Sequence, residues 1–320
     1  MKLHAIGNTG VSVTNLCFGT SVLGDMPDTY GYAVDEDRAR ATIHAIFDGP
    51  ANCIDTSRNY GLGRSEERIG AVIRERGGLQ DGFVISTKLD RDTRTDRLDA
   101  DRARRSLEES LEALSLDRVQ ILHLHDPEHA ADLSEITRPG GALDALFKFK
   151  EEGLADAVGL AMGTIDLMFP LVRERPFDVL ISHNRYTLLN RQADEMFDYA
   201  HEAGIAIFNA APYAGGVLAK GSAVMPKVTY QDATEESLAP VRMVEQVCAE
   251  HNLAPGAAAL QFSIDDPRIT STIVGVSKSE RVHQTIDWAN QSISKAARAQ
   301  LADLPYSSDD PEANRDYRLG

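Results

Sequence analysis

Short apolar, β-branched runs alternate along the chain with longer stretches in which apolar residues recur at three- and four-residue spacing. The short runs predict eight strands, at residues 15–20, 51–57, 83–89, 118–125, 156–162, 178–184, 205–211 and 271–277. The stretches between them predict helices at 36–48, 65–77, 101–114, 142–153, 164–175, 191–204 and 278–290. Segment 236–265 is expected to hold two further helices, separated near Pro255-Gly256.

This alternation predicts an α/β fold, a single (β/α)₈ TIM barrel formed by residues 1–320, because no linker or shift in composition interrupts it. Residues 2–14 contain two β-prone runs around a Gly-Asn-Thr-Gly turn, which indicates an N-terminal β-hairpin capping the barrel bottom. Residues 305–320 are polar and rich in Asp and Pro, so we expect a loose C-terminal tail. Residues 212–237 form a long connection, which is typical of a functional or disordered loop.

Composition narrows the possible partners. The chain has 320 residues and a formal net charge of −16, which argues against binding to nucleic acid or to an anionic membrane surface. No apolar run approaches the roughly 18 residues of a membrane helix, so we expect a soluble, cytoplasmic protein. Cys17, Cys53 and Cys248 have no metal-like spacing, and Cys17 and Cys53 lie within apolar runs, where buried free thiols are expected. The oligomeric state stays open.

Ionisable residues stand where three consecutive predicted strands end: Asp55, Lys88 and His125, with Tyr60 five residues after Asp55. Active sites of parallel barrels lie at the carboxyl ends of the strands. Adjacent strands are about 4.8 Å apart, so long side chains from three neighbours can converge. A phenol is a poor proton carrier at neutral pH, and a nearby ammonium stabilises its ionised form. We therefore expect Lys88 to act on Tyr60, Asp55 to hold Lys88, and His125 to bind a substrate oxygen.

These four residues match, in order and spacing, the tetrad of the aldo-keto reductases. The sequence segments around them, IDTSRNYGLGRSEERIG and LHLHDP, also resemble that family, as does VGVSKSERV at 274–282. The resemblance extends over nearly the whole chain. It implies an NAD(P)-dependent oxidoreductase in which hydride passes between a nicotinamide and a carbonyl/alcohol pair, with Tyr60 as proton donor or acceptor.

A cofactor site is indicated at residues 275–285, where Ser277, Lys278 and Arg281 open a predicted helix whose N-terminus could bind phosphate. The resemblance implies that Arg281 contacts the 2′-phosphate region, so NADP(H) is favoured and NAD(H) is the other possibility. Gly275 replaces a lysine common in NADP-preferring relatives, and Ala161-Met162 and His183 replace the usual carboxamide-binding residues. The expected cofactor contacts are Thr20, Asp55, His183, Pro212, Tyr213, Ala214, Ser277, Lys278, Arg281 and Gln284.

Two further segments, HDPE at 125–128 and RYTLLNRQA at 185–193, resemble one branch of the family. That branch includes L-fucose, D-threo-aldose and L-galactose 1-dehydrogenases and pyridoxal 4-dehydrogenase. The resemblance implies a small, polar, polyhydroxylated substrate, an aldose oxidised at its first carbon, or else an aldehyde that is reduced. Asn59 and Asp126 are the expected substrate contacts.

Two other classes of protein remain open. His123 and His125 form an HxH pattern that, with Asp126, His129 and His183, could hold a metal in a hydrolase barrel. Such barrels usually carry the HxH on the first strand, where this chain has only Cys17 and Thr20, so no metal site is expected. The second alternative is a non-catalytic NADP-binding regulatory subunit, and the complete tetrad favours an enzyme over it.

Overall fold

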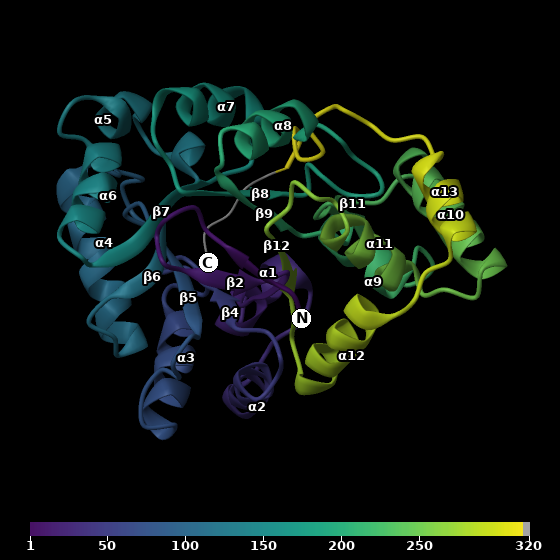
Figure 1. The fold of residues 1–320 in the computed structure, drawn as a ribbon, viewed down its shortest axis with the longest axis horizontal. Helices are drawn as coiled ribbons and strands as arrows, with labels where there is room; N and C mark the ends of the chain where they lie inside the picture. The colour runs from purple at the N-terminus through teal and green to yellow at the C-terminus, as the bar shows by residue number, and fades with distance from the viewer. Residues whose placement is uncertain (316–320) are drawn as a thin grey trace.

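The computed structural model describes residues 1–315, and a closed barrel of eight parallel strands forms its centre (Figure 1). The strands follow one another around the barrel in chain order, and the last pairs with the first. They are β3 (Leu16–Gly19), β4 (Cys53–Asp55), β5 (Val84–Leu89), β6 (Val119–His125), β7 (Ala155–Ala161), β8 (Val179–His183), β9 (Ala206–Ala210) and β12 (Ser271–Gly275). All eight coincide with the predicted runs to within two residues at either end, and the (β/α)₈ prediction is confirmed.

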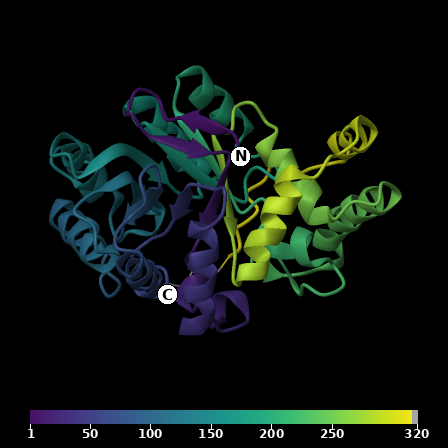
Figure 2. The same ribbon diagram turned by 60° about the horizontal axis from the view of Figure 1, so that its bottom comes forward.

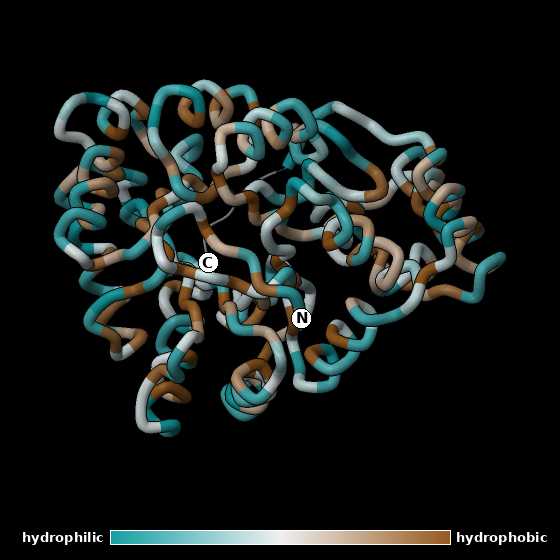
Figure 3. Tube along the Cα trace, in the orientation of Figure 1, coloured by the Kyte–Doolittle hydropathy of each residue, from teal (hydrophilic) through white to brown (hydrophobic). Residues whose placement is uncertain are grey.

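Helices surround this barrel, and hydrophilic residues line most of their outer turns (Figure 3). The larger ones are α2 (Glu36–Phe47), α3 (Arg64–Glu75), α4 (Ala100–Leu114), α6 (Ala142–Glu151), α7 (Ile165–Glu174), α8 (Asp194–Glu202), α10 (Glu235–Glu250), α11 (Pro255–Ile264), α12 (Ser279–Asn290) and α13 (Lys295–Ala302). The predicted break in 236–265 is confirmed, and Pro255 is the first residue of α11. At that position the main-chain N–H has no partner within the helix, so proline, which has no N–H, costs no hydrogen bond. Within residues 1–315, no helix is both long and apolar enough to cross a membrane.

Helix α4 illustrates how sequence specifies these elements. The Asp99 side chain accepts a hydrogen bond from the main-chain N–H of Arg102 and caps the helix N-terminus. Ala103, Leu107 and Leu114 recur at helical spacing and are buried against the barrel. The apolar stripe and the cap therefore fix both the start of the helix and the face that it presents to the strands.

The predicted N-terminal hairpin is present as β1 (Leu3–Ala5) and β2 (Ser12–Thr14), and Figure 2 shows it across one end of the barrel. Ile6, Val11 and Val13 are buried in a cluster with the interior residues of the strands. Several of these interior residues come from the amino-terminal halves of their strands, among them Cys17, Val84, Ile121 and Val179. The hairpin therefore closes the bottom of the barrel, and the carboxyl ends of the strands form its open end.

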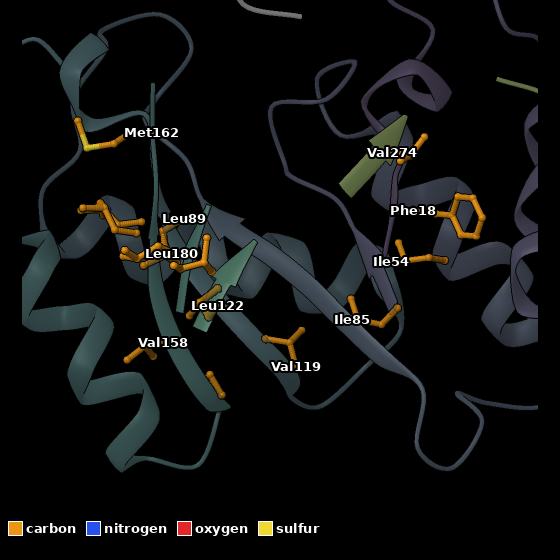
Figure 4. Close-up of a cluster of buried hydrophobic side chains, with 14 of the residues drawn as sticks. Phe18, Ile54, Ile85, Leu89, Val119, Leu122, Val158, Met162, Leu180 and Val274 are labelled. Carbon is orange, nitrogen blue, oxygen red and sulfur yellow. The ribbon is translucent and has the colours of Figure 1, made fainter. Parts of the chain in front are cut away.

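A second apolar layer lies between the strands and the helices. Figure 4 shows part of it, with Phe18, Ile54 and Leu122 directed away from the barrel interior. These residues are fully buried and pack with apolar residues of the surrounding helices. The strands are therefore apolar on both faces over most of their length, as buried parallel strands usually are.

The connection 212–237 is ordered and carries short elements of its own. They are η3 (Ala214–Gly216), α9 (Val217–Lys220), β10 (Lys227–Val228) and β11 (Gln231–Asp232). Val217 and Leu218 are buried in a third apolar cluster with residues of α10, α11 and α13. This cluster anchors the loop beside the open end of the barrel.

The expectation of a loose tail does not hold for residues 305–315. Ser307 exchanges main-chain hydrogen bonds with Leu189 and Arg191, and Asn190 donates from its amide to the carbonyl of Asp309. Arg185 forms an ion pair with Asp310 at 2.6 Å. The polar side chains that suggested a free tail form these contacts instead. Residues 316–320, also part of that expectation, lie outside the described residues.

Glu66, in the first turn of α3, is an unusual buried carboxyl with no solvent exposure. Its Oε1 atom accepts a hydrogen bond of 2.6 Å from the hydroxyl of Thr87 on β5, and Arg58 lies 3.7 Å from Oε2. Burial raises the pKa of Glu66 to about 7, although Thr87 and Arg58 act to lower it. The folded protein thus favours the protonated carboxyl.

The pH dependence of stability should reveal this group. An unfolded glutamate titrates near pH 4.3, so the contribution of Glu66 is complete below that pH and is lost as the pH rises to about 7. Glu66→Gln should therefore gain stability relative to the wild type between pH 4.5 and pH 8 in thermal unfolding. The control is Glu67→Gln, whose side chain is 56% exposed. Equal pH profiles for Glu66→Gln and the wild type would contradict a buried, protonated carboxyl.

Candidate active site

Asp55 and Lys88 meet inside the open end of the barrel, where β4 and β5 end. Lys88 Nζ lies 2.7 Å from Asp55 Oδ1 and also donates to the main-chain oxygen of Thr56 at 2.6 Å. The other oxygen of Asp55 accepts from the Ser86 hydroxyl at 2.9 Å. Asp55 and Lys88 are 3% and 1% exposed, so their attraction is little screened by water. The pair provides a fixed ammonium at the mouth.

Tyr60 lies on the loop between β4 and α3, and a close backbone contact holds that loop. Gly61 has φ +63°, and a side chain there would meet the main-chain oxygen of Gly24 at 1.8 Å. Arg64 donates to the same oxygen at 2.8 Å. Only glycine permits this approach at position 61. The loop directs the Tyr60 ring toward the buried ion pair, with Lys88 Nζ 4.8 Å from the ring centroid.

His125, at the end of β6, faces Tyr60 edge-on with the ring centroids 5.8 Å apart. The four residues of the expected tetrad therefore come together at the mouth of the barrel. His125 Nδ1 is directed at the carboxylate of Asp90, 2.5 Å from Oδ1. Burial tends to lower the pKa of His125, but the carboxylates of Asp126 and Asp90 outweigh it and the pKa is raised above the ordinary 6.5.

Asp90 belongs to this network and was missed by the sequence analysis. It follows β5 directly, is 1% exposed, and accepts from the Ser57 hydroxyl at 2.6 Å and from the Asn59 main chain at 2.9 Å. Burial acts to raise the pKa of Asp90, yet His125, Ser57 and Asn59 together hold it below its usual value. The signal was available: a carboxylate two residues after Lys88 directly follows the carboxyl end of the same predicted strand.

His123 points into the barrel interior below this network. In parallel register it lies opposite Lys88 on one side and Gly159 on the other. A side chain on Gly159 would meet His123 Nδ1 at 2.6 Å and the main-chain oxygen of Val179 at 2.3 Å, so glycine makes room for the ring. Burial, then the positive charges of Lys88 and His125, hold the pKa of His123 well below 6.5. The surroundings of His123 therefore disfavour its charged form.

The metal-site alternative gains no support from this geometry. Among residues 1–315, no group of three or more His, Cys, Asp or Glu side chains is arranged to hold a metal ion. The imidazole of His125 is paired with Asp90, and His183 lies 3.4 Å from Glu312. The two histidines of the HxH pattern thus lie in different surroundings: His123 is enclosed in the barrel interior, and His125 pairs with Asp90 at the mouth.

A cleft of about 520 Å³ extends from these residues to the start of α12. Of the residues expected at the site, those lining it are Thr20, Asp55, Asn59, Tyr60, Lys88, His125, Asp126, His183, Pro212, Tyr213, Ser277, Arg281 and Gln284. Ala214 and Lys278 are not among the lining residues: Ala214 is 2% exposed within the loop, and Lys278 is the N-cap residue of α12. Tyr213 packs edge-on against Trp288 of α12, with the ring centroids 6.0 Å apart.

Positive charge gathers at the α12 end of the cleft, in contrast to the acidic chain as a whole. Arg281 and Lys220 line it, and Arg38 of α2 donates to the main-chain oxygen of Ser277 at 2.6 Å and to its hydroxyl at 3.1 Å. The sequence analysis did not find Arg38, because it precedes Ser277 by 239 residues. The helix N-terminus and these cations suit a phosphate group.

The opposite side of the mouth is completed by the chain terminus. Glu312 has a side chain that is 7% exposed, and its Oε1 lies 3.4 Å from His183 Nε2 and 3.2 Å from Arg185 Nη1. Arg315 binds the other oxygen of Glu312 at 2.8 Å and also lines the cleft. On the barrel side, the amide nitrogen of Asn59 is buried without a hydrogen-bond partner among the described residues. A polar ligand could satisfy that donor.

Comparisons with known proteins agree with the fold and identify a family. A family model described as "Aldo/keto reductase family" matches residues 15–304. D-threo-aldose 1-dehydrogenase from Pseudomonas sp. is 29% identical, over 93% of this chain and 96% of that protein. L-galactose dehydrogenase from Arabidopsis thaliana is 30% identical, over 89% and 87% of the two chains. The solved holo form of an aldo-keto reductase from Bacillus halodurans has the same fold, with a TM-score of 0.77 at 17% identity and 97% coverage of each chain.

Proposed function

Because the chain belongs to the aldo/keto reductase family, an NAD(P)-dependent group of oxidoreductases, we propose that it is an aldose 1-dehydrogenase that oxidises the hemiacetal carbon of a sugar. The observation that carries this proposal is the convergence of Tyr60, the Lys88–Asp55 ion pair and His125 at one end of the cleft. The relatives named as dehydrogenases of D-threo-aldoses and L-galactose support the direction and the substrate class.

Each residue has a separate task in this proposal. Tyr60 accepts the hydroxyl proton of the substrate during oxidation and returns it during reduction. Lys88 favours the ionised phenol by its charge, and Asp55 keeps the ammonium in place through the 2.7 Å contact. His125 donates to the substrate oxygen and orients the reacting carbon. When bound, the nicotinamide supplies the hydride acceptor or donor.

The residues along the cleft fit such a cofactor. The α12 terminus with Ser277 and Arg281 would hold the phosphates, and Arg38 adds a charge behind Ser277. Thr20, Pro212, Tyr213 and Gln284 would line the remainder, and His183 would face the carboxamide. Lys278 and Ala214 do not line the cleft, so in this proposal they would support the residues that contact the cofactor. We propose NADP(H) as the preferred form, because Arg281 and Arg38 can bind an additional phosphate.

A polyhydroxylated substrate suits the polar rim of the mouth. The unpartnered amide of Asn59 and the carboxylate of Asp126 would bind sugar hydroxyls beside the reacting carbon. Tyr30 and Tyr230, whose ring centroids are 6.4 Å apart, line the cleft and offer apolar faces to a sugar ring. The proposed substrate is therefore a small molecule, with neither nucleic acid nor membrane as partner.

A substrate screen tests this proposal directly. Aldoses of both series, with NAD⁺ or NADP⁺, should produce an increase in absorbance at 340 nm (the reduced-nicotinamide band), and at least one aldose should exceed simple alcohols in kcat/KM. If simple aldehydes with the reduced cofactors gave the only turnover, the aldose assignment would be wrong while the oxidoreductase assignment would stand. Activity with neither set would contradict both.

Tyr60→Phe tests the proton-transfer role. The substitution removes the exchanging hydroxyl but keeps the ring beside Lys88, so kcat should fall by at least about 10²-fold, within the range of acid–base contributions. The dissociation constant of the cofactor, measured by fluorescence titration, should stay within about twofold. Tyr199→Phe, on the outer helix α8, is the matched control. Retention of more than a few per cent of the wild-type rate in Tyr60→Phe would disprove the assigned role.

Arg281→Ala tests the cofactor assignment. Loss of the guanidinium should weaken NADP(H) binding by 10-fold or more and leave NAD(H) nearly unaffected, because a single charge-assisted phosphate contact contributes about 1.5–3 kcal/mol. Isothermal titration with both cofactors gives the two ratios. Arg242→Ala, on the exposed face of α10, serves as control. Equal weakening of both cofactors would remove the 2′-phosphate contact from Arg281.

A further inference from the structure

We propose that Asp90 is a positioning residue that keeps both ring nitrogens of His125 protonated, so that Nε2–H donates a hydrogen bond to the substrate oxygen. The inference rests on the proposed function, since it assigns His125 its donor role in that reaction. It assigns Asp90 a part in the chemistry that the tetrad alone does not include.

The protons in this network can be assigned from the partners of Asp90. Its Oδ2 atom accepts from the Ser57 hydroxyl at 2.6 Å and from the main-chain N–H of Asn59 at 2.9 Å. The carboxyl is thus an acceptor of strong hydrogen bonds, which favours its ionised form. Its Oδ1 atom lies 2.5 Å from His125 Nδ1, and a carboxylate oxygen at this distance requires a proton on the nitrogen. His125 therefore donates through Nδ1.

This assignment constrains the other nitrogen of the ring. A neutral imidazole has one N–H, so a neutral His125 bound to Asp90 would offer only a lone pair at Nε2. Such a ring could not donate to a carbonyl or alkoxide oxygen. The donor role at the mouth requires the second proton, and the carboxylate of Asp126, 3.6 Å from Nε2, favours that charge.

The balance of buried charge points the same way. Asp90 is 1% exposed, and an isolated carboxylate there would be strongly unfavourable. Lys88 is bound to Asp55, and Arg102 reaches only the main-chain oxygen of Asp90 while its guanidinium pairs with Glu109. A protonated His125 supplies the cation that Asp90 needs. The mouth then contains two neutral ion pairs, Asp55 with Lys88 and Asp90 with His125.

All charged neighbours enter this balance. Lys88 on β5 and Asp90 just after that strand face His125 from one side. Tyr60 faces it from the loop after β4. His123 lies on the same strand as His125, and Asp126 directly follows that strand. Glu128 and His129 lie farther out and interact with Asp126. Lys88 disfavours the second proton, whereas Asp90 and Asp126 favour it. Removal of the Asp90 charge should shift this balance toward the neutral ring.

Nitrogen-15 NMR of the histidine rings tests the proposal without any substrate. In the wild-type protein, both nitrogens of His125, identified by their loss in His125→Gln, should be protonated at pH 7 and titrate above pH 6.5. Asp90→Asn should lower the titration midpoint by at least one pH unit. The matched control Asp178→Asn removes a carboxylate that binds Lys150 and the Val158 main chain before β8, and it should leave the midpoint unchanged.

Kinetics provide the second measurement. Because the Nε2 donor is lost as pH rises, kcat/KM in carbonyl reduction, which reports groups of the free enzyme, should fall through a limb at the NMR midpoint of His125, and Asp90→Asn should displace that limb. A merely structural role would lower kcat/KM by the same factor at every pH and leave the limb in place, which overturns the proposal. A His125 ring that is neutral at pH 6.5 in the wild type also overturns it, even if Asp90→Asn does not fold. The NMR result stands whether or not an aldose is the substrate.

Discussion

A lysine ammonium and an aspartate carboxylate lie 2.7 Å apart at the mouth of the barrel, each almost without solvent exposure. Removing two such charges from water costs several kcal/mol per ion, and their attraction offsets this only when the remaining polar atoms are also satisfied. Here the Thr56 carbonyl accepts from Lys88, and the Ser86 hydroxyl donates to Asp55. The surrounding strand ends therefore satisfy the remaining polar atoms of the pair, and the Tyr60 ring lies beside it, with its centroid 4.8 Å from Lys88 Nζ.

The same requirement for paired buried charge extends outward from this centre. Asp90 faces His125, and on the far side of the mouth Glu312 is enclosed by His183, Arg185 and Arg315. The pKa of Glu312 is held below its ordinary value because these positive groups outweigh the effect of burial. Three buried carboxylates with basic partners thus lie around the mouth of the barrel. Arg38, Lys220 and Arg281, for which no carboxylate partner is found among residues 1–315, gather at the α12 end of the cleft. This division is consistent with the elongated cofactor and neutral substrate of the proposed function.

Much of this architecture could be predicted from the sequence because its signals are local or repeated. Eight β-branched runs with intervening helical periodicity specify a parallel barrel, and the barrel in turn places Asp55, Lys88 and His125 on neighbouring strand ends. Asp90 directly follows the predicted strand 83–89, but its contact with His125, 35 residues later in the chain, leaves no mark in the local pattern. The packing of residues 305–315 against the barrel was also not predicted. Their Asp and Glu residues pair with Arg185 and Asn184, about 125 residues earlier in the chain, and composition alone does not reveal such contacts.

The central claim is that Lys88 and Tyr60 act as one proton-transferring unit, and a double-mutant cycle tests it most directly. Turnover of Lys88→Met, Tyr60→Phe and the double variant would be compared, with circular dichroism to verify the fold and cofactor titration to verify the cleft. The account predicts that the double variant loses little more activity than either single variant, because residues that act as a unit are not additive. Losses that multiply in the double variant would show that the ammonium and the phenol act independently, which would contradict the account.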